Sequence, residues 1–135
     1  MKLTGGIWTL VFLAIVAGCA PSLQPLPPNV QMPQLTGRWE GTWAGTMTHP
    51  MNMEVTEQKE GRVSGAVIFI TQQYGERTFP MAGTLGLRDG KLVLVIDVGM
   101  GGHSDRFEFT TIEPTKLEGQ GYGRHHTGPV SLTRR

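Results

Sequence analysis

The sequence predicts an all-β protein in which eight antiparallel strands close into an up-and-down barrel. Three observations carry this prediction. Apolar and polar residues alternate through eight successive segments, hairpin-sized turns separate these segments, and sixteen glycines lie between Gly37 and Gly128. Alternation is typical of a strand with one buried face, short connections favour antiparallel neighbours, and abundant glycine disfavours long helices. Closure removes the exposed edges that an open sheet would leave.

Length and charge narrow the domain organisation. The 135 residues allow one compact domain, which we place at residues 36–135, after a helical signal peptide at 1–18 and a proline-rich tether at 19–35. Removal of Lys2 with the leader leaves eleven of the twelve basic residues, against eleven acidic ones. Because no basic run remains, the composition argues against a nucleic-acid partner.

The amino-terminal segment has the features of a secretory leader. Lys2 precedes eleven apolar or near-apolar residues at 7–17, a length that suits a signal-peptide core and is too short to span a bilayer. The end of this stretch and the two residues after it, Val16-Ala17-Gly18-Cys19, resemble the lipobox of bacterial lipoproteins. An uncleaved anchor in which Cys19 is an ordinary apolar residue is the alternative.

The lipobox resemblance implies a specific processing route. In that family the cysteine thiol receives a diacylglyceryl group, the chain is cut between Gly18 and Cys19, and the new amine is acylated. Membrane lipid is then a partner of the protein through Cys19. The next residue is Ala20, whereas the lipoproteins that many bacteria retain in the inner membrane have an aspartate at this position. By this resemblance we expect an outer-membrane lipoprotein that faces the periplasm.

Residues 20–35 (APSLQPLPPNVQMPQL) contain five prolines and no charge. This composition predicts an extended, polyproline-like spacer with little packing of its own. At about 3.1 Å per residue it would hold the domain some tens of ångströms from the bilayer. Docking of its last few residues as an extra strand is the alternative, although proline cannot donate ladder hydrogen bonds.

The eight predicted strands follow one another directly. They span residues 37–46, 51–58, 62–71, 78–87, 91–98, 106–112, 116–124 and 129–134. Parity places the following side chains inside the barrel: Trp39, Trp43, Met51, Met53, Val55, Val63, Val67, Phe69, Leu85, Leu87, Leu92, Leu94, Ile96, Phe107 and Phe109.

The motif Gly37-Arg38-Trp39 opens the first strand and resembles the Gly-x-Trp start of lipocalins and other calycins. In those proteins an arginine of the last strand packs across the tryptophan and closes the barrel floor. Arg134 has the position for this role, because the last strand of a closed meander pairs with the first. Short avidin-type barrels have a similar start and finish, but the residues that avidins use on biotin have no counterparts here.

The interior admits two interpretations. Six glycines share the inward parity, namely Gly41, Gly45, Gly65, Gly119, Gly121 and Gly123. They either leave space for one small apolar ligand, lined by Trp43, Met53, Phe69 and Phe107, or make room for Trp39 and Trp43 in a solid core. We favour a filled barrel or one with a shallow mouth.

Outward parity gathers apolar residues on the third to fifth strands, at Ile68, Ile70, Ala82, Val93 and Val95. Such a patch marks a partner surface or self-association, unless the tether folds over it or a bulge near Gly65 shifts the parity.

Candidate catalytic or metal-binding groups are sparse. His125 and His126 are consecutive and point to opposite faces, and His49 and His103 with Asp105 lie in turns, where we expect solvated side chains. We therefore expect no catalytic residue, metal or cofactor. The leading interpretation is a non-enzymatic envelope lipoprotein whose barrel binds a small apolar ligand or an envelope protein. A structural or assembly subunit with a filled barrel is second, and a small hydrolase or metal protein is third.

Overall fold

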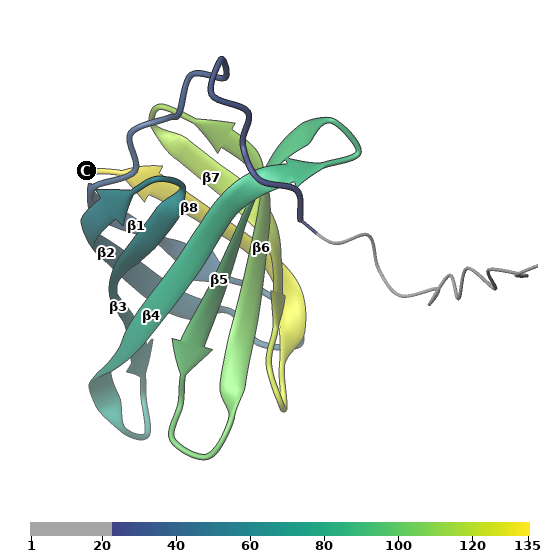
Figure 1. Ribbon diagram of the computed structural model, residues 1–135. Coiled ribbons are helices and arrows are strands. Elements are labelled where there is room, and N and C mark those ends of the chain that lie inside the picture. Colours follow the sequence, from purple (N-terminus) through teal and green to yellow (C-terminus); the bar gives the residue numbers. More distant parts are fainter. Residues whose placement is uncertain (1–22) are drawn as a thin grey trace, which may run out of the picture.

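The computed structural model describes residues 23–135, so the predicted leader, the predicted cleavage site and Cys19 lie outside the described residues. The chain forms a closed barrel of eight antiparallel strands in sequence order (Figure 1). The strands are β1 (Gly37–Trp43), β2 (His49–Lys59), β3 (Arg62–Thr71), β4 (Gly75–Arg88), β5 (Lys91–Gly99), β6 (Ser104–Glu113), β7 (Lys116–Tyr122) and β8 (Thr127–Arg134). The predicted fold class is confirmed. In residues 23–135 no helix has the length and apolarity needed to cross a membrane.

The two ends of the barrel differ. The floor end carries the turns at 60–61, 89–90 and 114–115, together with the start of β1 and the carboxyl terminus. The loop end carries the connections at 44–48, 72–74, 100–103 and 123–126. At the floor end, Glu60-Gly61 and Asp89-Gly90 all have positive φ, which is the conformation of the tight turns that suit the twist of a hairpin.

Several strand ends differ from the prediction. β1 stops at Trp43 rather than at residue 46, and β7 stops at Tyr122 rather than at residue 124. One further hydrogen bond in register follows each strand, from Ala44 N to Pro129 O and from Gly123 N to His126 O, before the chain enters a loop. β4 begins three residues before the predicted start, because it pairs with β3 as far as Thr71 opposite Gly75.

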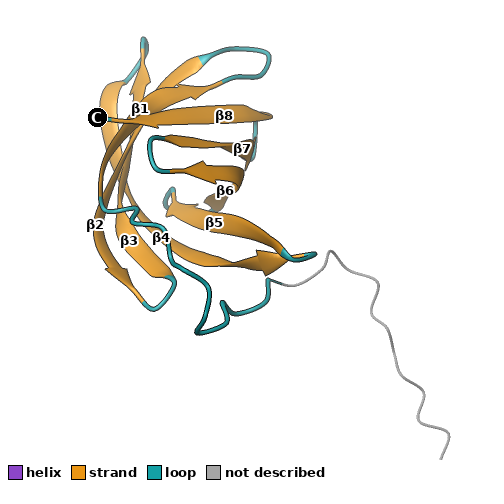
Figure 2. Cartoon of the chain, turned by 90° about the horizontal axis from the view of Figure 1, so that it is seen from above, coloured by secondary structure: helices purple, strands orange, loops and turns teal. Residues whose placement is uncertain are grey.

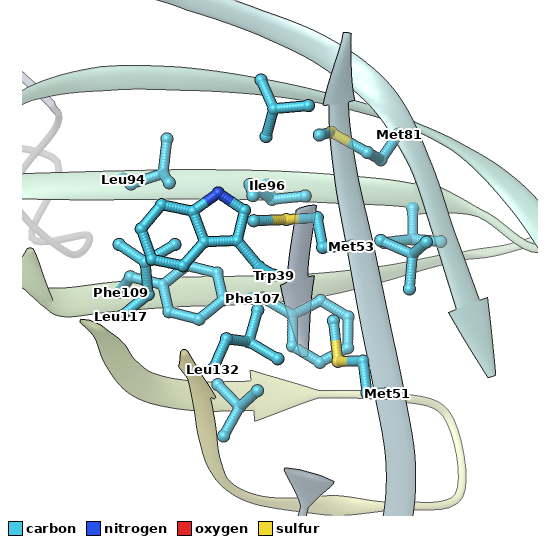
Figure 3. Close-up of a cluster of buried hydrophobic side chains, with 14 of the residues drawn as sticks. Trp39, Met51, Met53, Met81, Leu94, Ile96, Phe107, Phe109, Leu117 and Leu132 are labelled. Carbon is cyan, nitrogen blue, oxygen red and sulfur yellow. The ribbon is translucent and has the colours of Figure 1, made fainter. Parts of the chain in front are cut away.

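Parity correctly predicted the interior. The residues placed inside are buried or pack against the core, except that Leu87 is half-buried outside it, and β7 and β8 add Leu117, Val130 and Leu132. In Figure 3 the labelled side chains of Met53, Leu94, Ile96, Phe109, Leu117 and Leu132 surround the Trp39 indole. The core therefore contains Trp39 at the floor end as its largest fully buried side chain.

Three of the inward-parity glycines have a role that neither interpretation included. A Cβ at Gly41, Gly65 or Gly119 would overlap a carbonyl oxygen of the neighbouring strand. Gly65 and Gly119 lie opposite the register shifts at Val55/Glu57 in β2 and Phe109/Thr111 in β6. These positions mark bends at which adjacent backbones approach closely, a known use of glycine in barrels.

The amino-terminal segment, residues 23–36, corrects the prediction of a spacer with little packing. The backbones of Gln24 and Leu87 exchange two hydrogen bonds, of 2.7 and 2.8 Å. Leu26 and Met32 pack against the core, and Leu35 is fully buried in it. Figure 2 shows this segment running along the barrel from the β4 side towards β1. Leucine and methionine side chains alternate with the prolines, and their burial outweighs the poor hydrogen-bonding capacity of a proline-rich backbone.

Candidate functional site at the loop end

Side-chain contacts around Arg134 close the floor end of the barrel. The Arg134 guanidinium carbon lies 4.5 Å from the centroid of the Trp39 ring, the contact that the Gly-x-Trp resemblance implies. Its Nε donates to Pro114 O at 2.9 Å, and its two terminal nitrogens donate to Thr36 O at 2.6 Å and to Gln34 O. A Cβ at Gly37, which has a φ of +125°, would lie 3.1 Å from this guanidinium.

The Trp39 indole is also satisfied. Its Nε1 donates to Leu35 O at 2.9 Å, and the Gln58 side chain binds both Leu35 N and Pro33 O, at 2.7 and 2.8 Å. The Trp39 indole N–H and the Gln58 side chain are therefore both engaged by the amino-terminal segment. The floor is a structural closure.

Aromatic rings gather at the loop end instead. The Trp43 ring lies edge-on to Phe107 at 4.8 Å and to His126 at 4.5 Å, with Phe69 at 5.9 Å. His49 in turn lies 5.1 Å from His126. Edge-to-face pairs of this kind add about 0.5–1.5 kcal/mol each beyond burial. The rings fill this end of the barrel.

Three buried polar atoms at this end lack a hydrogen-bond partner within residues 23–135. They are Trp43 Nε1, His126 Nε2 and Asp105 Oδ1. A fourth such atom, Arg88 Nε, lies on the outer wall. Because buried polar groups in native proteins are nearly always paired with protein or water, a cluster of unpaired ones is informative. It marks the loop end as the candidate site.

Asp105 stands out among these groups. It is the second residue of β6, at the loop end, and is only 5% exposed, which corrects the expectation of a solvated turn residue. Burial raises the pKa of its carboxyl above the ordinary value, while His103, the Arg124 backbone amide and His125 oppose that shift. His103 Nε2 lies 3.6 Å from Asp105 Oδ1, which is too far for a hydrogen bond.

The histidines divide as parity requires. His125 is exposed, whereas His126 is half-buried against Trp43. His49 is the first residue of β2 and is half-buried beside His126. The expectation of solvated side chains is therefore wrong for His49 and His126. The sequence signal for the burial of His126 is that it shares inward parity with Gly128 and Val130. Across the described chain, no three His, Cys, Asp or Glu side chains are placed to hold a metal ion.

The four residues predicted to line a ligand site are only partly brought together. Trp43, Phe69 and Phe107 meet at the loop end, whereas Met53 pairs with Trp39, nearer the floor. A Cβ at Gly121 would lie 2.5 Å from Trp43 Nε1, and one at Gly123 would lie 2.7 Å from the same ring. Gly45 abuts His126 in the same way. These three glycines make room for rings, as the filled-barrel interpretation requires.

Exposed apolar side chains also favour the loop end. Among residues 23–135 the large exposed hydrophobic side chains are Val30, Met47, Ile70, Tyr74 and Tyr122. All except Val30 lie in the loop-end connections or at the strand ends beside them. Arg77 packs over Tyr74, with its guanidinium carbon 5.8 Å from the ring centroid. Apolar groups gathered on one surface indicate a contact surface.

The predicted partner face on β3 to β5 is not a continuous apolar surface. Val93 is only 3% exposed, because it lies opposite Gly86, where Leu23 and Gln24 cross the wall. Ala82 and Val95 line a broad groove that also contains the ion pairs Arg88–Glu108 and Arg106–Asp97, at 2.9 and 3.0 Å. Ile68 lies in a separate depression, and Ile70 faces the loop end. The alternative considered for this face was that the tether folds over it. The amino-terminal segment does cover the face at Val93.

Comparisons with known proteins support the fold. No protein-family model and no curated protein matches the chain. A solved structure of a redesigned beta barrel is 15% identical with a TM-score of 0.56, and the match covers 75% of this chain and 90% of that one. Two further barrels are 13% identical with TM-scores of 0.53, each covering 75% of this chain and 94% of the other. They are described as a de novo fluorescence-activating beta barrel and as a redesigned beta barrel, mFAP1, bound to DFHBI.

Proposed function

We propose that this protein is a lipid-anchored lipoprotein of the bacterial envelope whose barrel binds a small aromatic or apolar molecule at the loop end, without catalysis. The observation that carries the binding proposal is the cluster of unpaired atoms at Trp43 Nε1, His126 Nε2 and Asp105 Oδ1. A ligand that brings both an acceptor and a donor into this aromatic end would satisfy them. Pockets that combine apolar walls with a few polar groups are typical of small-molecule sites.

The shape of the site limits the ligand to a small one. Trp43, Phe69 and Phe107 already fill the barrel below the mouth, so the ligand lies above Trp43, where His126 now packs. The His126 ring is held there by the loop contact from Gly123 N to His126 O, of 2.8 Å. A structure of the same fold is described as bound to DFHBI, which supports the capacity of such a barrel to hold a small molecule.

The lipoprotein part of the proposal rests on the lipobox-like sequence Val16-Ala17-Gly18-Cys19 and on the short apolar core before it. Acylation of Cys19 would attach the barrel to a membrane with more than one chain, which is what stable anchoring needs. We place it at the outer membrane, facing the periplasm, because Ala20 follows the cysteine. Binding would then occur close to a membrane surface.

The two tryptophans of the mature chain provide a matched test. Trp8 lies in the leader, so Trp39 and Trp43 contribute the only indole N–H resonances after cleavage. We would titrate acetanilide, which carries an aromatic ring, a carbonyl acceptor and an amide donor, and record nitrogen–proton spectra. The Trp43 resonance should shift saturably, while that of Trp39, already bonded to Leu35 O, should stay. Trp39→Phe and Trp43→Phe variants assign the two signals.

Native mass spectrometry of the protein from bacterial envelopes completes the test. Retention of a small molecule by the wild-type chain, and its loss from the Trp43→Phe variant but not from Trp39→Phe, is the expected result. A wild-type chain that carries no added mass and shows no Trp43 shift would contradict the ligand proposal.

A second candidate function has its own observation. Met47, Ile70, Tyr74 and Tyr122 are exposed at the loop end, and they suit a protein partner or a second copy of the chain at the same end. In that case the loop end is an assembly surface of a filled barrel. Dimers or heavier species in the native mass spectrum, lost in a Met47→Ser, Tyr74→Ser double variant, would favour it over the ligand.

A further inference from the structure

The amino-terminal segment joins the barrel wall almost immediately after Cys19. Only residues 20–22 separate Cys19 from Leu23 in the sequence. At Gln24 the backbone already exchanges two hydrogen bonds with Leu87, near the floor end of β4. A Cβ at Gly86 would lie 2.6 Å from the Leu23 side chain and 2.5 Å from Gln24 O. The chain is therefore packed against the wall from these residues onward.

The rest of the segment is held as firmly at its other end. The Gln58 side chain bonds Pro33 O and Leu35 N, and Arg134 bonds the carbonyl oxygens of Gln34 and Thr36. Leu35 is fully buried. Residues 24–35 consequently add nothing to the reach of a tether, although the sequence suggests a spacer over the whole stretch.

Covalent geometry then limits how far the barrel can stand from its anchor. Four residue steps join Cys19 to Leu23, and an extended chain spans at most about 3.6 Å per residue, so the two Cα atoms lie within about 14 Å of each other. The ten residues of β3, at a rise of about 3.3 Å and a barrel tilt of about 40°, correspond to a barrel length of roughly 25 Å. The reach of the free chain is thus shorter than the barrel.

We infer that the floor-end corner formed by β4, β5 and the 89–90 turn rests on the bilayer that holds the Cys19 acyl chains, and that the loop end faces away from it. The partner of this corner is the phospholipid surface itself. The inference rests on the proposed acylation of Cys19 and adds an orientation to it. Ligand exchange at the loop end then takes place on the side of the aqueous compartment.

The charges at this corner do not set the orientation. Exposed Lys59, Arg62 and Lys91 lie close in the sequence to exposed Glu60 and Asp89, at the two neighbouring floor-end turns. Mixed signs give little net attraction to an anionic surface. The short tether fixes the corner on the membrane, so the orientation should be insensitive to salt.

Site-specific quenching in vesicles tests this arrangement on the full, processed chain. Cys19 is the single cysteine, and acylation blocks its thiol, so a thiol-reactive bimane labels only an introduced cysteine. We would place the label at Lys91→Cys beside the 89–90 turn, at Tyr74→Cys in the loop end on the β4 side, and at Met47→Cys in the loop end near β1. All three positions are exposed. The vesicles contain phosphatidylethanolamine, phosphatidylglycerol and a lipid with a nitroxide on its headgroup.

The expected result is strong quenching at residue 91 and little at residues 74 and 47, unchanged between low and high salt. Quenching at residue 74 as strong as at 91 means that the barrel lies on its side, and equal quenching at all three means that it tumbles freely. Either result overturns the inferred orientation while leaving the lipoprotein proposal intact. A wild-type chain that takes up bimane, or whose mass lacks acyl groups, overturns the lipoprotein proposal and the orientation with it.

Two variants test the role of the short tether. Twelve flexible Gly/Ser residues inserted between Ala20 and Pro21 should reduce quenching at residue 91 to the level seen at residue 47. Gln24→Pro removes the amide that donates to Leu87 O and should lower the quenching in part by freeing the first residues of the segment. Unchanged quenching at residue 91 in the insertion variant would show that another contact holds this corner on the membrane.

Discussion

Replacement of Arg134 by alanine tests how far one side chain closes the floor end and holds the amino-terminal segment. Its guanidinium lies over Trp39, with 4.5 Å between the guanidinium carbon and the ring centroid, and donates to the carbonyl oxygens of Gln34, Thr36 and Pro114. These contacts join four separate parts of the chain. Arg134→Ala removes all of them at once.

The expected loss follows from the individual contacts. The cation–π contact contributes about 1 kcal/mol. The three hydrogen bonds end on residues that are themselves exposed, so water can replace the arginine and each bond contributes about 0.5–1 kcal/mol net. Together these terms give a destabilisation of about 3 kcal/mol. For a domain of this size that corresponds to a fall in Tm of roughly 15 °C.

Urea denaturation of residues 19–135 with Cys19→Ser measures this loss. The matched control is Arg135→Ala. Arg135 forms an ion pair with Glu40 at 2.6 Å, but the two side chains are 72% and 37% exposed, so its removal should cost less than about 1 kcal/mol. Arg134→Lys keeps the charge without the fork of donors and should lie between the two alanine variants. Equal destabilisation by Arg134→Ala and Arg135→Ala would refute this account of the floor.

Three further predictions concern the loop end and the leader. Because burial raises the folded-state pKa of Asp105 above its unfolded value, ionisation opposes folding, and the wild-type chain should gain stability as the pH falls from neutral through that raised pKa. In urea denaturation at pH 7, Asp105→Asn should therefore be more stable than the wild-type chain, and this difference should disappear below about pH 4. A difference that grows on acidification contradicts the raised pKa of Asp105. Gly121→Ala places a Cβ 2.5 Å from Trp43 Nε1 and should cost about 1–3 kcal/mol, whereas Gly99→Ala, with its nearest atom at 3.7 Å, should be nearly neutral in the same melts. Cys19→Ser should abolish acylation by mass and release the protein from membranes; a variant that stays membrane-bound means that the leader is an ordinary anchor.

The candidate site was only partly predictable. The aromatic residues Trp43, Phe69 and Phe107 follow from parity, because successive side chains of a strand alternate between its faces. Asp105 shares that inward parity with Phe107, yet the sequence placed it in the loop before a strand predicted to begin at Arg106. Its burial depends on how the loops at 100–103 and 123–126 close over it, and loop closure has no periodic signal in the sequence.

The amino-terminal segment shows the same limit. Five prolines and the absence of charge are consistent both with a free spacer and with a chain laid along a barrel wall. The decision depends on contacts across long sequence separations, such as Gln24 with Leu87 and Leu35 with Gln58. Composition describes the chain by itself and carries no information about these distant partners.

The sequence by itself determined the barrel, its strand order and its buried face, which follow from local alternation, short turns and the closure of a meander, in which the last strand pairs with the first. The contact of Arg134 with Trp39 was implied by the resemblance of Gly37-Arg38-Trp39 to the Gly-x-Trp start of calycins. Only the tertiary structure decided three others: the packing of residues 24–35, the bends at Gly65 and Gly119, and the unpaired polar atoms near Trp43. The physical reason is that each depends on the distance between atoms far apart in the chain, which the folded barrel alone sets.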